Sequence, residues 1–156
     1  MTNTAFALSG AANAAPPLVA ALEMRANILD LTQQAEDAVL RPDDPGGWSH
    51  AQRAAMAARI ARLNDDTALA DHYGGAVDAA PMADPGWQGE DKRTRAALRF
   101  MDAMARDPRD MEAGDIARLL QAGIDDADIV RLSELNAFLA YQLRLVAGLR
   151  LLTGAA

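Results

Sequence analysis

The stretch that decides the fold is residues 125–152, DDADIVRLSELNAFLAYQLRLVAGLRLL, near the end of the chain. Apolar residues recur in it every three or four positions, which predicts one long helix with a buried stripe. Phe138, Leu145, Leu151 and Leu152 put further apolar groups on its other faces, so we expect this helix to be central or to lie at a subunit interface. The stripe itself is Ile129, Leu132, Leu135, Leu139, Leu143, Val146 and Leu149.

The rest of the chain also favours packed helices over strands. It has 156 residues, of which 51% are hydrophobic but only 4% aromatic, and alanine supplies much of the apolar share. Turn-forming residues separate the helical patterns at 41–47 and 80–89. We therefore expect an all-α fold, a compact bundle of about six helices, with the predicted ranges 18–40, 51–63, 67–79, 90–106, 111–122 and 125–152.

Several of these helices carry their own boundary signals. Ser49 is expected to cap the second helix, and Gly123 is expected in a left-handed conformation after the fifth. In the first helix the apolar stripe is Ala21, Met24, Ile28, Leu31, Ala35 and Val39, and the polar face carries Glu23, Arg25, Asp30 and Glu36. Before it, residues 1–17 are expected to form a flexible arm, because small residues dominate and Pro16-Pro17 can only begin a helix. Residues 18–156 are expected to form a single domain.

Charge and composition narrow the possible functions. With 22 acidic and 15 basic residues the net charge is −7, so nucleic acid is not expected as a partner. The absence of cysteine excludes disulfides, thiolate metal sites, iron–sulfur clusters and cysteine nucleophiles. The sequence shows neither a secretory signal nor a membrane span, so we expect a cytoplasmic protein with no membrane partner. We expect no metal and no cofactor, because the chain has only two histidines and Asp71, beside His72, points elsewhere.

Two stretches resemble the carboxymuconolactone decarboxylase/alkylhydroperoxidase D-like family, in its peroxidase-related branch. The clearer one runs from Leu98-Arg99-Phe100-Met101 through Arg106-Asp107-Pro108 to residues 119–129, LLQAGIDDADI. It is similar to the helix, the "R-D-P", the "AG-hydrophobic" and the "D-x-x-I" pattern of that branch. The resemblance implies an alkylhydroperoxidase D-like helical fold, and none of these positions is catalytic in the family.

The second stretch, Gln52 to Tyr73, covers the place where active family members carry a Glu, a Cys-x-x-Cys and a His. The resemblance puts Asp66 and Leu69 at the cysteine positions, Ala54 at the glutamate, and His72 and Tyr73 where histidines occur. Both thiols are missing, and a carboxylate cannot replace a thiolate as the nucleophile that reduces a peroxide. The resemblance therefore implies a relative without thiol peroxidase activity.

Asp66, His72 and Tyr73 are the candidate catalytic residues. In the functional interpretation, His72 or Tyr73 is a general acid/base, and Asp66 orients it or a ligand. In the alternative, Asp66 caps a helix and the other two only pack. Three functions stay open at this stage. They are a cysteine-free relative that binds a small apolar or carboxylated molecule, an enzyme acting on a lactone or related ring acid, and a structural or interaction module. We also expect the chain to associate with itself as a homo-oligomer.

Overall fold

The computed structural model describes residues 3–74 and 77–154. Within these ranges it has eight α-helices, three 3₁₀-helices and no strand, which confirms the all-α expectation with more helices than the six expected. The α-helices are α1 (Thr4–Leu8), α2 (Pro16–Glu23), α3 (Ala26–Leu40), α4 (His50–Leu63), α5 (Thr67–Tyr73), α6 (Lys92–Arg106), α7 (Ala113–Gln121) and α8 (Asp126–Thr153). The 3₁₀-helices are η1 (Ala11–Asn13), η2 (Val77–Ala83) and η3 (Pro108–Asp110).

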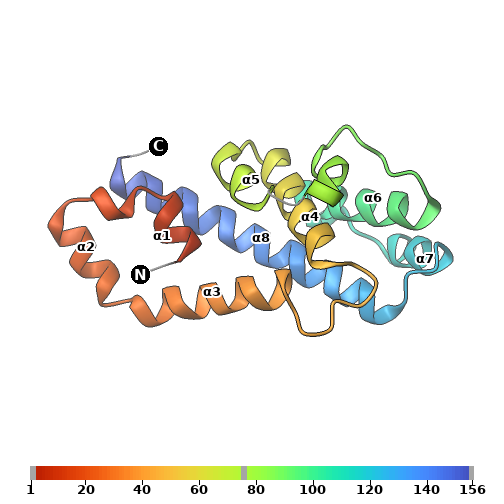
Figure 1. Ribbon diagram of the computed structural model, residues 1–156, viewed down its shortest axis with the longest axis horizontal. Coiled ribbons are helices and arrows are strands. Elements are labelled where there is room, and N and C mark those ends of the chain that lie inside the picture. The colour runs from red at the N-terminus through yellow and green to blue at the C-terminus, as the bar shows by residue number, and fades with distance from the viewer. Residues whose placement is uncertain (1–2, 75–76, 155–156) are drawn as a thin grey trace.

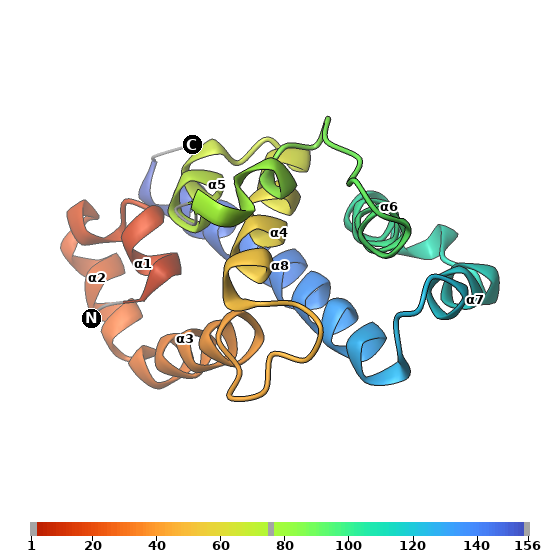
Figure 2. The same ribbon diagram turned by 45° about the vertical axis from the view of Figure 1, so that its right-hand side comes forward.

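The long helix α8 runs through the molecule, as its sequence predicts. Figure 1 shows α3 along one side of it, α1 and α2 near its C-terminal end, and α6 and α7 at the opposite end. Figure 2 shows α4 crossing in front of α8. Because α8 contacts α1, α3, α4, α6 and α7, it must bury side chains on several faces. Within the described residues no helix combines the length and apolar character needed to cross a membrane.

The main apolar core lies where α4, α6 and α8 meet. Helix α4 buries four alanines, Ala55, Ala57, Ala58 and Ala61, whose small side chains let neighbouring backbones approach closely. Larger groups fill the space between the helices, and they include Met56, Ile60, Leu98, Met101, Leu135 and Leu139. A second, smaller cluster joins the N-terminal segment to the end of α8 through Ala5, Ala11, Leu22, Val146 and Leu149.

That second cluster corrects the expectation of a flexible N-terminal arm. Residues 4–8 form α1, and Ala5 and Ala11 are fully buried. Asn3 caps α1 through the backbone N–H of Phe6, and its side-chain amide also donates to the carbonyl of Leu29. The sequence was misleading here because small residues suit a close contact between helices as well as they suit a flexible segment.

The helix expected over residues 18–40 is also different in the structure. It is two helices, α2 and α3, which meet at Met24 and Arg25. Most of its apolar stripe faces outward, and only the last member, Val39, packs against the core. Met24, Ile28 and Leu31 are exposed, whereas Leu29 and Glu36 are buried. The stripe gives the expected homo-oligomer an apolar surface to use, and the assembly itself stays a prediction.

Other boundaries follow the sequence closely. Ser49 caps α4 in a complete capping box with Gln52, and Gly123 has a φ of 82° after α7. The helix expected over residues 67–79 is shorter than predicted, because α5 ends at Tyr73. Gly75, part of the weak point expected there, lies outside the described residues.

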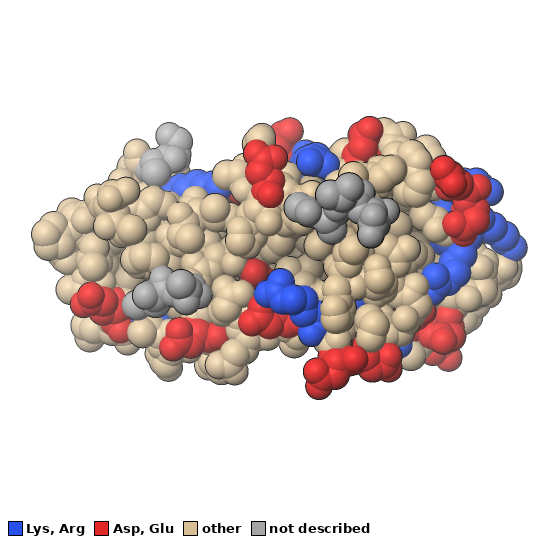
Figure 3. Space-filling model, viewed as in Figure 1, with Lys and Arg blue, Asp and Glu red and all other residues tan. Residues whose placement is uncertain are grey.

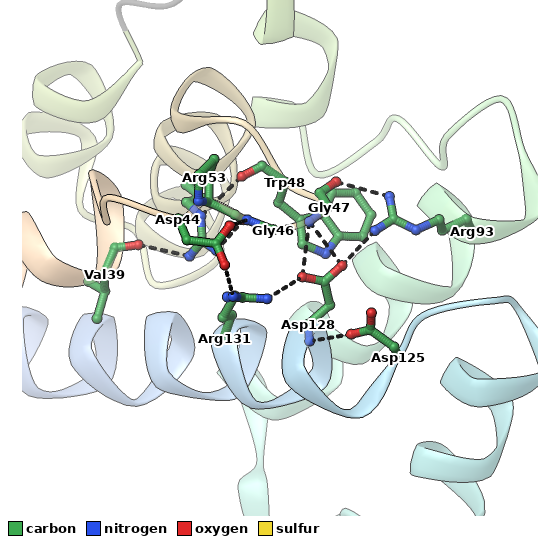
Figure 4. A network of polar contacts seen from close by, with 11 residues as sticks. Val39, Asp44, Gly46, Gly47, Trp48, Arg53, Arg93, Asp125, Asp128 and Arg131 are labelled. Carbon is green, nitrogen blue, oxygen red and sulfur yellow. Dashed lines mark hydrogen bonds and ion pairs between the residues drawn. The ribbon is translucent and has the colours of Figure 1, made fainter.

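A polar network fixes the loop between α3 and α4 (Figure 4). The Asp128 carboxylate, near the start of α8, accepts hydrogen bonds from the backbone N–H of Gly47 at 3.0 and 3.1 Å. It also pairs with Arg93 at 2.9 Å and with Arg131 at 3.1 Å. The buried Arg53 donates to three backbone carbonyls, those of Val39, Pro45 and Trp48. The loop is thereby held in place, and with it the end of α3 and the start of α4.

Candidate acid-base site around Glu36

A buried carboxylate, that of Glu36 on α3, forms the centre of the candidate site. Only 2% of the residue is exposed, so its charge must be stabilised by the protein. Oε1 accepts from the Thr4 hydroxyl at 2.8 Å and from the Gln33 amide at 3.2 Å. Oε2 accepts from the Tyr73 hydroxyl and from the Gln142 amide, both at 3.0 Å. These donors come from α1, α3, α5 and α8, so four helices converge on one charge.

The surroundings of Glu36 keep it ionised. Burial alone would raise its pKa, but the contacts with His72, Thr4, Gln33 and Tyr73 together outweigh burial and hold the pKa below its ordinary value of 4.5. The pattern is unusual because the hydrogen-bond donors are neutral side chains and no arginine or lysine pairs with the carboxylate among the described residues. Within residues 3–74 and 77–154, His72 is the one side chain in contact with Glu36 that can become a cation.

His72 lies at the edge of the cluster, with 39% of its side chain exposed. Its Nε2 is 3.2 Å from the Thr4 hydroxyl oxygen and 3.8 Å from Glu36 Oε1. The Thr4 hydroxyl has one proton, and it donates a hydrogen bond with this proton to Glu36 Oε1, its shorter contact, at 2.8 Å. The Thr4 oxygen can then accept a hydrogen bond from Nε2 of His72, in the tautomer that carries its proton on that nitrogen. In the neutral ring, Nδ1 is left as the basic nitrogen.

Tyr73 is a hydrogen-bond donor to Glu36 and not a base. Burial, followed by the negative charge of Glu36 and the hydrogen bond to it, raises the pKa of the Tyr73 hydroxyl above its ordinary value. The side chain is 5% exposed, and its ring meets the His72 ring edge-on with centroids 5.0 Å apart. Tyr73 therefore contacts both Glu36 and His72, and it keeps its own proton as a hydrogen-bond donor.

The cluster opens into a pocket of about 640 Å³. Arg41 stands in its wall and pairs with Asp37 one turn earlier on α3. Ala54, which the family resemblance puts at the position of the relay glutamate, lines the same pocket. The full lining is Asn3, Thr4, Ala7, Gln33, Glu36, Asp37, Leu40, Arg41, Ala54, His72 and Tyr73.

The structure places the third candidate, Asp66, elsewhere. Its carboxylate accepts from the backbone N–H of Leu69 at 3.0 Å and so caps α5. The same carboxylate makes a two-pronged ion pair with Arg150 of α8, at 2.7 and 3.1 Å. It lines other pockets than the one that holds His72 and Tyr73. The helix-capping alternative for Asp66 is thus confirmed, and Asp66 does not orient His72.

The part of the chain that the structure describes contains no cluster of metal ligands. Nowhere in it do three His, Asp or Glu side chains gather as ligands would. The second histidine, His50, is exposed and contacts the carbonyl of Pro42 at 2.9 Å. It lies outside the Glu36 pocket.

Sequence reasoning missed Glu36 because it placed this residue on the exposed face of its helix. A second stripe with helical spacing was present, namely Leu29, Thr32, Glu36 and Leu40, and it is the buried one. Its leucines were the signal that could have identified this face. The partners that make burial of Glu36 tolerable, Thr4 and Gln142, are 32 and 106 residues away in the chain.

Comparisons with known proteins support the fold but give no function. No protein-family profile matches the sequence, and no curated protein matches it. Among solved structures, an uncharacterized peroxidase-related protein from Silicibacter sp. TM1040 is similar, with a TM-score of 0.65 and 18% sequence identity over 79% of this chain and 68% of that one. The likeness shows an alkylhydroperoxidase D-like helical fold.

Proposed function

Starting from the alkylhydroperoxidase D-like fold, we propose that this protein binds a small molecule in the Glu36 pocket and moves a proton on it through His72, without a thiol. The observation that carries the proposal is a buried, ionised carboxylate beside a half-exposed imidazole at a pocket wall. Polar groups of this kind, converging on a cavity, are typical of acid-base sites. The chain would be a cysteine-free relative of the family, and we expect no thiol peroxidase activity from it because it has no cysteine.

In this proposal His72 is the proton-transferring group. Its Nδ1 takes a proton from the bound molecule, and the ring becomes a cation that Glu36 stabilises directly and through the Thr4 hydroxyl. Tyr73 and Gln142 hold the carboxylate in position for this. The arrangement follows the general rule that a base is effective when a third group fixes its ring and its tautomer.

We propose a lactone or related ring acid as the substrate class. A carbon next to the carbonyl of such a ring gives up its proton to a base, and the electron pair of the broken C–H bond moves into the enolate. In the reverse step His72 returns a proton to the same carbon. Between the two steps the proton on the His72 ring exchanges with water. Arg41 in the pocket wall pairs with Asp37 through one nitrogen and has further N–H donors for a ring carboxylate, and the resemblance to carboxymuconolactone decarboxylases favours this class.

The test is proton exchange in D₂O, followed by NMR on five-membered lactones with and without a ring carboxylate. We expect the purified protein to catalyse deuterium incorporation next to the carbonyl. In the His72→Ala variant this rate should be at least about a hundredfold lower than in the wild type, as is usual when a general base is removed. His50→Ala is the matched control, since it removes the other histidine of the chain, and it should keep the wild-type rate.

A scaffold role is the second candidate, favoured by the four helices that meet at Glu36. In that case the cluster stabilises the fold and the pocket has no ligand. Equal exchange rates for wild type and His72→Ala, together with no thermal shift by any lactone or ring acid, would decide for the scaffold and against catalysis.

A further inference from the structure

A second pocket, far from Glu36, gathers positive charge on a protein with a net charge of −7. It lies between α6 and α7 and has a volume of about 420 Å³. Four cations line it: Lys92, Arg95, Arg99 and Arg118. Figure 3 shows Lys and Arg atoms at the end of the molecule formed by α6 and α7, next to acidic residues. Phe100, Ala96 and Ala122 give the pocket an apolar part.

The protein compensates little of this charge. Asp115, which pairs with Arg118, is the one acidic residue in the lining. Lys92 donates to the carbonyl of Gln121 at 2.7 Å, and Arg95 donates to the carbonyl of Glu90 at 2.7 Å. Backbone carbonyls are neutral overall, so these contacts fix side-chain positions without neutralising them. Arg99 makes no hydrogen bond and no ion pair to the described residues.

The positions of these cations also break the local rules of helix stability. Asp91 caps α6, but the first turn itself contains no acidic residue, and Lys92, Arg93 and Arg95 begin the helix. Cations near a helix N-terminus oppose the helix dipole. Arg95 and Arg99 are four residues apart, a spacing at which like charges repel. Arg93 is compensated by Asp128, whereas Lys92, Arg95 and Arg99 face the pocket without a carboxylate of their own.

We propose that the α6–α7 pocket binds a small multivalent oxyanion, a polycarboxylate or a phosphorylated molecule. Guanidinium groups hold carboxylate and phosphate oxygens through paired N–H donors, and Arg99 has all of its donors available to an anion. The pocket is open to solvent but small, and the chain is acidic as a whole, so the pocket does not suit an extended nucleic-acid backbone. The site is independent of the proposed chemistry at His72.

The test uses titration calorimetry of the full chain with citrate and with pyrophosphate, and acetate as the monovalent reference. We expect saturable binding of at least one of the two multivalent anions, weakened by added salt. Binding of citrate alone would identify the ligand as a polycarboxylate, and binding of pyrophosphate alone would identify it as a phosphorylated molecule. Binding of both would show that the pocket recognises the oxyanion groups that the two have in common. Acetate should bind at least about tenfold more weakly, because it carries one charge.

Arg99→Gln is the decisive variant, because the exposed side chain makes no contact that the fold needs. The affinity for the anion should fall about tenfold, as expected for the loss of one charge-assisted hydrogen bond. Arg25→Gln changes the net charge equally at the junction of α2 and α3, at the other end of the molecule, and should leave the affinity unchanged. Equal affinities in the two variants, or no binding of either multivalent anion by the wild type, would overturn the proposal. His72→Ala should bind the anion as the wild type does.

Discussion

Two buried carboxylates, Asp128 and Glu36, are stabilised in opposite ways. Asp128 is 4% exposed and pairs with two arginines and a backbone N–H, so its charge is balanced by nearby cations (Figure 4). Glu36 is 2% exposed, has neutral donors and one imidazole, and lines a pocket. Full ion pairing is typical of a structural role. A carboxylate that keeps its charge beside a cavity is available to act on a ligand.

The comparison also explains why the two sites differ in their dependence on precise packing. Around Asp128 the ends of two charged side chains lie directly against the Gly47 backbone, in the space that a larger residue would need. A Cβ on Gly47 would lie 2.3 Å from the Asp128 carboxylate and 1.9 Å from the Arg93 guanidinium. Around Glu36 the donors are flexible side chains, and the pocket leaves space beside them. The Asp128 network is therefore expected to be the more sensitive to substitution.

The largest effect is expected from Asp128→Ala. Removal of this carboxylate leaves Arg93 without its ion-pair partner, leaves Arg131 with Asp44 alone and frees the loop before α4, so the free energy of unfolding should fall by about 3–5 kcal/mol. Urea denaturation measures it. Asp126→Ala, two residues earlier and exposed, is the matched control, with an expected loss below about 1 kcal/mol. Similar losses in the two variants would contradict the structural role of Asp128.

Gly47→Ala sharpens the same point with a single methyl group. The new Cβ can be placed only if Asp128 and Arg93 move apart, and we expect a loss of about 1–3 kcal/mol. Gly114→Ala, on α7, has nothing nearer than 3.9 Å and should be neutral or stabilising by up to about 1 kcal/mol. Thermal unfolding of both proteins compares them directly. A Gly47→Ala protein as stable as the wild type would show that the network tolerates rearrangement.

Glu36→Gln should have the smallest effect at neutral pH, about 1–2 kcal/mol, from the loss of charge-assisted hydrogen bonds. Its pH dependence is the sharper readout. Because the pKa of Glu36 is lower in the folded than in the unfolded chain, the unfolded chain takes up the proton first as the pH falls. The stability from this group is complete above about pH 4.5 and is lost below it as the folded pKa is crossed.

The measurement is the free energy of unfolding of wild type and Glu36→Gln between neutral and acidic pH. We expect the difference between them to be constant at neutral pH and to shrink under acid, because the variant has no proton to take up at this position. A difference that stays the same down to acidic pH would mean that Glu36 is not a stabilised anion, and the proposed support of His72 would fail with it.

Much of the helical framework could be read from the sequence, because its signals are local. The 3.6-residue periodicity of residues 125–152, the Ser49 cap, the break after residue 40 and Gly123 all act within a few residues, and the structure has each of them. Of the three candidate site residues, His72 and Tyr73 do come together, and Asp66 has the capping role that the sequence allowed as the alternative. These features depend on backbone geometry and on neighbours along the chain.

Only the tertiary structure decided which face of α3 is buried, that the N-terminal segment packs against α8, and that Glu36 joins His72. The sequence offered two stripes on α3, and the one with fewer polar residues turned outward. The burial of Glu36 depends on Thr4, Tyr73 and Gln142, which only folding brings together. A charge can be buried when distant donors supply its hydrogen bonds, and no local pattern encodes their arrival.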